Sequence, residues 1–165
     1  MLEKLHQIER QLPDLLVQDG WQSLYVDYHP PIVERVWRQE GDYRINLHCI
    51  HPCEPEEALM HPHPWPSAIK ILSGKYRQGI GYSSGRETPP IAATTIMTYG
   101  SSYEMVNKDG WHYVAPIDDV VMSLMVTGKP WDRWAPRSEK QLNPLSEKMV
   151  KEILEFFGDR YKLRP

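Results

Sequence analysis

The sequence lacks the features that mark several large classes of protein. Its 165 residues contain no apolar run approaching the roughly eighteen that a membrane-spanning helix needs, so we expect no membrane segment. The stretch from Met1 to His6 lacks the apolar core of a signal peptide, which predicts a cytoplasmic protein. Lysine and arginine are scattered without a basic stripe, and the net charge is -3. This pattern argues against a nucleic-acid partner.

Cysteine is also scarce. Cys49 and Cys53 are the only two, and no second pair accompanies them, so a zinc finger is disfavoured. A disulfide between them is geometrically feasible, but a reducing cytosol does not favour it. We therefore expect two ordinary thiols.

Proline and glycine are plentiful, with 15 and 10 residues, and they separate short apolar runs. This pattern is typical of a turn-rich β protein rather than a helical bundle. A chain of this length with 41% hydrophobic residues suits one domain with one core. We predict a single domain over residues 1–165, with its strand-rich core at about 30–130 and helical segments at about 2–18 and 146–158.

The apolar runs indicate where the strands lie. In residues 43–50, Tyr43, Ile45, Leu47 and Cys49 alternate with Arg44, Asn46, His48 and Ile50, so the two sets face opposite sides of a strand. Further strands are expected at 33–40, 67–72, 76–82, 91–99, 102–106, 111–116 and 120–127.

Helical spacing of apolar residues marks both ends of the chain. Residues 2–17 predict one or two short helices, because Pro13 interrupts the pattern. Near the C-terminus, Ser146 is a suitable N-cap and Gly158 is placed to end the helix.

The main functional signal is the segment 61–67, which reads His-Pro-His-Pro-Trp-Pro-Ser. His61 and His63 are two positions apart, so an extended backbone projects both to one face. Two imidazoles so placed need only one more ligand to bind a metal, and His112 is the candidate. The alternatives are a stiff polyproline-like loop with exposed histidines, and a core His112 bonded to backbone.

In a strand-rich context the histidine pair resembles the first motif of the cupin superfamily. That motif has a His-x-His pair, an acidic residue four positions after the second histidine, and a glycine seven positions further on. His61 and His63 match the pair, and Gly74 matches the glycine. Ser67 stands where the motif has its acidic residue.

The rest of the resemblance is looser and covers about residues 40–128. The leading glycine of the first motif is Pro55 here. His112 resembles the histidine of the second motif, but Gly110 is one position off, and Pro116 replaces the final asparagine.

The resemblance implies a mainly β protein with a cupin-type double-stranded β-helix, a jelly-roll barrel, and helices at the N- and C-termini. It also implies a divalent transition metal inside the barrel, with iron favoured over zinc, nickel, manganese or copper. The implied ligands are His61, His63 and His112, and Glu104 is the candidate carboxylate. Other potential ligands are Glu54, Glu56, Glu57, His48 and His51.

Losing the motif carboxylate leaves a three-histidine site, as in the cupin thiol dioxygenases and some diketone-cleaving dioxygenases. Such a site keeps open positions for substrate. An inward arginine would bind a substrate carboxylate bidentately. Candidates for lining the cavity are Ser67, Tyr76, Arg77, Tyr82, Tyr99 and Tyr103.

We therefore predict a metal-dependent dioxygenase acting on a small polar or carboxylate-bearing molecule. Two alternatives stay open: a non-catalytic cupin that binds a small ligand with a degenerate metal site, and a metal-dependent isomerase or hydrolase. The apolar stripes of the terminal helices suggest a homodimer.

Overall fold

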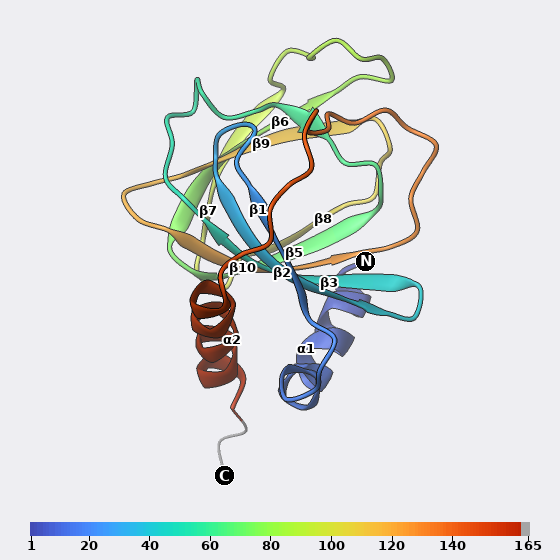
Figure 1. Ribbon diagram of the computed structural model, residues 1–165. Helices are drawn as coiled ribbons and strands as arrows, with labels where there is room; N and C mark the ends of the chain where they lie inside the picture. The colour runs from blue at the N-terminus through green and yellow to red at the C-terminus, as the bar shows by residue number, and fades with distance from the viewer. Residues whose placement is uncertain (163–165) are drawn as a thin grey trace.

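The computed structural model describes residues 1–162, in which two antiparallel sheets carry a helix at each end of the chain (Figure 1). The predicted mainly β class with terminal helices is confirmed, and the arrangement fits a cupin-like sandwich or barrel. In chain order the elements are α1 (Leu2–Leu16), β1 (Gln22–Val26), β2 (Val33–Glu40), β3 (Tyr43–Ile50), β4 (His61–Pro62), β5 (Ser67–Ser73), β6 (Lys75–Tyr82), β7 (Ala93–Thr98), β8 (Ser102–Met105), β9 (Gly110–Pro116), β10 (Val121–Thr127) and α2 (Glu147–Tyr161).

The larger sheet has the strand order β1-β2-β3-β10-β5-β8, and the smaller sheet has the order β4-β9-β6-β7. Two of these strands, β1 and β4, are not expected from the apolar pattern. The short β4 forms only because His61 and Pro62 pair with His112 and Trp111 of β9. This pairing ties the proline-rich loop to the smaller sheet.

The main core lies between the larger sheet and the two helices, which sit on the same side of it (Figure 1). Alternation along β3 places Ile45 and Leu47 in this core, with Tyr43 and Cys49 packed at its margin. They meet buried residues of both helices, among them Leu12 and Phe157. A buried side chain of this size stabilises the fold by about 1.5–3 kcal/mol, so this layer anchors the sheet.

Both helices differ in detail from expectation. The helix α1 runs without a break through Pro13, which lies in its last turns and disturbs little of the helix. The Ser146 hydroxyl caps α2 by accepting from the Met149 amide at 3.3 Å, as predicted. Gly158 does not end α2, which continues to Tyr161.

Gly74 forms the turn between β5 and β6. Its φ of +75° is a left-handed conformation, and a Cβ there would lie 2.7 Å from the Val120 carbonyl oxygen. Glycine is therefore required at this motif position by the backbone.

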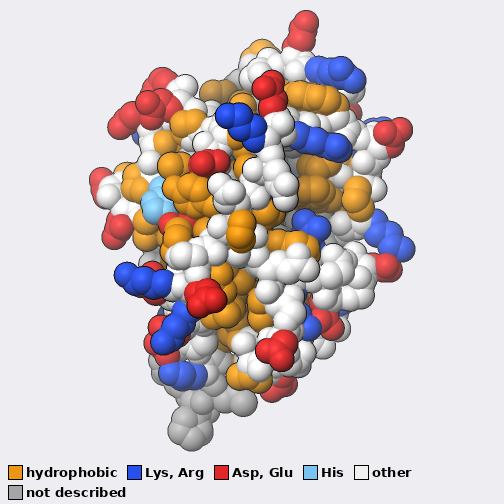
Figure 2. All heavy atoms as spheres, viewed as in Figure 1, with side chains coloured by type: hydrophobic (Ala, Val, Ile, Leu, Met, Phe, Trp, Pro, Cys, Tyr) orange, Lys and Arg blue, Asp and Glu red, His pale blue; other side chains and the backbone are white. Residues whose placement is uncertain are grey.

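The face of the molecule shown in Figure 2 has no concentration of one charge. Lys and Arg side chains are interspersed with Asp and Glu on the face shown in Figure 2. Neither helix among residues 1–162 is long and apolar enough to cross a membrane. Both cysteines are free thiols, as expected.

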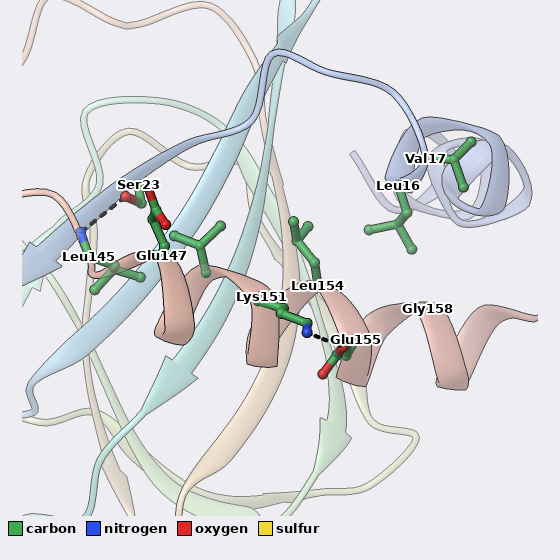
Figure 3. Close-up of a pocket in the computed structure, with 10 residues that line it drawn as sticks. Leu16, Val17, Ser23, Leu145, Glu147, Lys151, Leu154, Glu155 and Gly158 are labelled. Atoms are coloured by element: carbon green, nitrogen blue, oxygen red, sulfur yellow. Dashed lines mark hydrogen bonds and ion pairs between the residues drawn. The ribbon is translucent and has the colours of Figure 1, made fainter.

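A groove lies between the end of α1 and α2, with Leu16, Val17 and Leu154 on its walls (Figure 3). Its polar contacts hold the chain together: the Leu145 amide donates to Ser23 Oγ at 3.0 Å. None of the described histidines or cysteines lines this groove.

Candidate metal centre

Three histidines meet between the two sheets. His61 of β4 lies directly opposite His112 of β9 in the register, and His63 follows β4 by one residue. Their ligand nitrogens all lie within 4.8 Å of one another. Nitrogen atoms bound to one tetrahedral metal at about 2.1 Å are roughly 3.4 Å apart, which falls within this limit. The cluster therefore fits a single metal ion.

Each imidazole is held through its Nδ1 atom. The partners are the Leu59 carbonyl for His61 at 2.9 Å, the Ser67 hydroxyl for His63 at 2.9 Å, and the Gln78 side-chain amide for His112 at 3.2 Å. The Leu59 carbonyl can only accept, so Nδ1 of His61 carries the proton and Nε2 has a free lone pair. Such contacts fix ring orientation in metal sites.

Ser67 and Gln78 support the ligands from behind. Both are almost fully buried, with exposed fractions of 0% and 1%. The Ser67 hydroxyl lies 2.9 Å from Nδ1 of His63 and therefore contacts this imidazole through its Nδ1 edge. With a metal on Nε2, Nδ1 would carry the proton and the hydroxyl would accept it. The Gln78 side-chain nitrogen lies 3.2 Å from Nδ1 of His112. The same amide with its nitrogen and oxygen exchanged would accept from a protonated Nδ1, which is the arrangement that leaves Nε2 of His112 free for a metal.

Burial keeps the three imidazoles neutral. It lowers the pKa of His61 to about 4, although the Leu59 carbonyl opposes the shift. It also lowers the pKa of His63 and of His112 well below the usual value. Neutral imidazole is the form that binds a metal, so the site is ready for an ion at neutral pH.

The cluster opens into a cavity of about 460 Å³ between the inner faces of the two sheets. Its walls include Trp65, Ile69 and Met125, and the hydroxyl groups of Tyr76 and Tyr103 are 2.7 Å apart there. Residues 130–142 contribute to the mouth, where the Trp131 amide donates to the Pro64 carbonyl at 2.7 Å. This bond ties residues 130–142 to the loop that carries the histidine pair.

Of the residues expected to line the cavity, Tyr76 and Tyr103 do so, and Ser67 contacts Nδ1 of His63. Arg77 points to the opposite side of β6, since its neighbours in the strand face inward, and it is exposed. Tyr82 and Tyr99 lie at strand ends with exposed fractions of 59% and 58%. The structure therefore does not bring these three to the cavity.

Glu104 is also apart from the histidines. Its carboxylate accepts from the Leu2 amide at 2.9 Å and lies 3.0 Å from the amino group of Met1. The alternation of β8 turns Tyr103 inward and Glu104 outward. No other acidic residue of the described chain takes its place: the group at the three histidines contains imidazoles only.

Sequence reasoning did not place Arg35 in the cavity, and it considered His48 only as an alternative metal ligand. Both line the cavity, and the Arg35 Nε donates to His48 Nε2 at 3.0 Å. The alternation of residues 43–50 already set His48 on the face away from the core. Arg35 lies opposite His48 in the register, but a strand pairing cannot be read from the sequence.

A second group of potential metal ligands lies outside the cavity. Glu34, Cys49 and His51 have ligand atoms within 4.8 Å of one another, and His51 Nε2 is 2.7 Å from the Glu34 carboxylate. Burial, together with nearby carboxylates, raises the pKa of the Cys49 thiol to about 11. These residues occupy the face of β2 and β3 opposite to Arg35 and His48.

Comparison with known proteins supports the fold. No protein-family model matches the sequence, and no curated protein is significantly similar to it. Hydroxypropylphosphonic acid epoxidase from S. wedmorenis has a similar structure, with a TM-score of 0.53 and 12% identity over 67% of this chain. Fe(II)-HppE with the alternative substrate (S)-1-HPP gives a TM-score of 0.50 and 12% identity over 64% of this chain.

This chain spans only 58% and 55% of those two chains. The Bacillus halodurans protein BH2720 matches over 81% of this chain and 85% of its own, with a TM-score of 0.47 and 11% identity. At such identities the likeness concerns the fold alone.

Proposed function

We propose that this chain is a cupin-type metal protein in which His61, His63 and His112 hold a divalent transition metal, iron first. We further propose that it acts as a dioxygenase or related oxygenase on a small polar or carboxylate-bearing molecule. The observation that carries this is the convergence of three neutral imidazoles, each oriented through Nδ1, in one cavity. A metal bound there would supply open coordination positions for substrate and dioxygen.

The chain's own residues prepare the site in two ways. Apolar walls that include Trp65, Ile69 and Met125 reduce the contact of the reacting groups with water, which strengthens polar interactions beside them. Burial also raises the pKa of Tyr76 and of Tyr103, so both phenols stay protonated and together offer a hydroxyl hydrogen to a bound ligand.

Iron is favoured because a structure of similar fold is described as Fe(II)-HppE. Imidazole suits zinc, nickel and copper as well. With zinc or manganese the same site would act as a Lewis acid, which is the isomerase or hydrolase alternative. A chain that binds no metal would be the non-catalytic ligand-binding alternative.

Metal content tests the site. We expect about one equivalent of metal per chain after expression with added iron, zinc or manganese, and loss of that equivalent in His61→Ala and His112→Ala. Cys49→Ser is the control, because it disables the outer group of Glu34, Cys49 and His51 and leaves the cavity intact. A metal that is lost in Cys49→Ser and kept in His112→Ala would contradict the proposal.

Oxygen uptake then separates the reactions. Iron-loaded protein should consume dioxygen with small thiols, diketones or hydroxy acids, and His112→Ala should not. Turnover without oxygen uptake, retained with zinc, would favour the isomerase or hydrolase.

A further inference from the structure

Three polar side chains form a row across the inner face of the larger sheet. Arg35 of β2 lies opposite His48 of β3, and His48 lies opposite Ser123 of β10. All three line the cavity that contains the histidine cluster. Apolar side chains such as Val33 and Met125 surround the row and offer its polar groups no hydrogen-bond partners. A polar ligand in the cavity would supply these partners.

The charge of Arg35 has no acidic partner. No carboxylate of residues 1–162 lies within ion-pairing distance of it, and no described Asp or Glu lines the cavity, whereas Arg133 and Arg137 do. Its Nε is used by His48, so the two Nη groups remain for another acceptor. Burial lowers the pKa of Arg35 to about 10, which leaves it charged at neutral pH.

Ser123 gives an independent observation. It is 1% exposed, and its hydroxyl has no hydrogen-bond partner among the described residues. A buried hydroxyl without a partner costs free energy, so such groups are found where something else accepts or donates. A ligand in the cavity would do so here.

His48 prepares the arginine. Because guanidinium can only donate, Nε2 of His48 must accept and is therefore unprotonated. Burial and the charge of Arg35 lower the pKa of His48 well below its usual value, so it does not compete as a cation. The bond to His48 fixes the orientation of the Arg35 guanidinium and leaves both Nη groups free to donate to a ligand.

We propose that Arg35 and Ser123, with Arg35 positioned by His48, bind the oxyanion group of a small substrate, either a carboxylate or a phosphonate. This assignment rests on the proposed function, because it takes the three histidines at the other end of the cavity to be a metal site. The anionic group sits on the larger sheet, so the rest of the molecule extends toward His61, His63 and His112 on the smaller sheet. An arginine fork matches both kinds of oxyanion bidentately.

Calorimetric titration of the full-length protein tests the subsite. The probes are lactate, methylphosphonate and lactamide, the neutral analogue of lactate, and each is titrated before and after metal removal with a chelator. We expect saturable binding of at least one anion and at least tenfold weaker binding of lactamide. The preferred anion decides between carboxylate and phosphonate.

Variants locate the binding. Arg35→Met should weaken anion binding at least tenfold, Arg35→Lys less, and Ser123→Ala by a few-fold. Arg77→Met is the matched control, because it removes the same charge from an exposed position outside the cavity, and it should change nothing. Circular dichroism of each variant checks that it is folded.

Three results would overturn the subsite: no anion binding by the wild type, equal binding of lactate and lactamide, or equal effects of Arg35→Met and Arg77→Met. Anion binding that survives Arg35→Met and vanishes with the metal would place the anion on the metal and also refute it. Arg35-dependent binding in a protein that takes up no metal would support the subsite and refute the proposed metal function.

Discussion

Replacing Ser67 with alanine tests the proposed metal centre and keeps its three proposed ligands, His61, His63 and His112. The hydroxyl lies 2.9 Å from Nδ1 of His63, and both residues are buried, with exposed fractions of 0% and 8%. In the alanine variant Nδ1 has no acceptor, so the ring loses its fixed orientation and its preferred tautomer. We therefore expect weaker metal binding in a protein that still folds.

The size of the effect follows from two costs. A buried donor without a partner costs about 1–3 kcal/mol of folding free energy. Loss of an outer hydrogen bond to a ligating histidine weakens metal affinity by about 10–100-fold. Competition of zinc or cobalt between the protein and a chromophoric chelator measures the affinity, and urea unfolding of the metal-free protein measures the stability.

Controls make the Ser67 experiment decisive. Ser67→Thr keeps the hydroxyl and should keep most of the affinity. Ser101→Ala removes a hydroxyl that accepts from the Thr98 amide at 3.1 Å in an exposed turn, and should not affect the metal. Unchanged affinity in Ser67→Ala would refute the orienting role.

Three further predictions concern pH, packing and ligand identity. In metal-free protein the pKa of His61 is lowered from 6.5 to about 4, so the unfolded chain takes up the proton first as the pH falls. Urea unfolding should therefore show about 3 kcal/mol of stability lost from this group between pH 7 and pH 4, and a flat profile would contradict its burial. In Gly79→Ala the new Cβ would lie 2.0 Å from the ring of Tyr113, which should cost about 1–3 kcal/mol in thermal or urea unfolding. Glu104→Gln should leave the metal content unchanged, and a loss of metal would restore Glu104 as a ligand.

Sequence periodicity accounts for much of the fold. The alternation of Ile45 and Leu47 with His48 predicted the two faces of β3, and Ser146 predicted the start of α2. The strands β1 and β4 were missed because their apolar signal is weak and their pairing depends on distant strands. His61 in β4, for example, pairs with a residue about fifty positions away.

The candidate site was only partly predictable. The spacing of the histidine pair and Gly74, with His112 at the second motif, pointed to three histidines that the structure brings together. The contact of Ser67 with His63 could not be predicted from the sequence. The motif shows that the acidic residue is missing at position 67, but it does not show what a serine there contacts. Arg77 was chosen over Arg35 because the sequence does not reveal which face of each strand turns to the cavity.

The division of β3 into two faces has a consequence for engineering. Side chains that stabilise the sheet against the helices alternate, one by one, with side chains that face the cavity. The apolar cavity-facing residues Val33, Ile50 and Met125 also pack in a second hydrophobic cluster. Libraries of variants restricted to the polar cavity-facing positions Arg35, His48 and Ser123 would therefore sample new ligand preferences at the least risk to folding. Along β3, residues that stabilise the fold thus alternate with residues whose change would alter ligand binding.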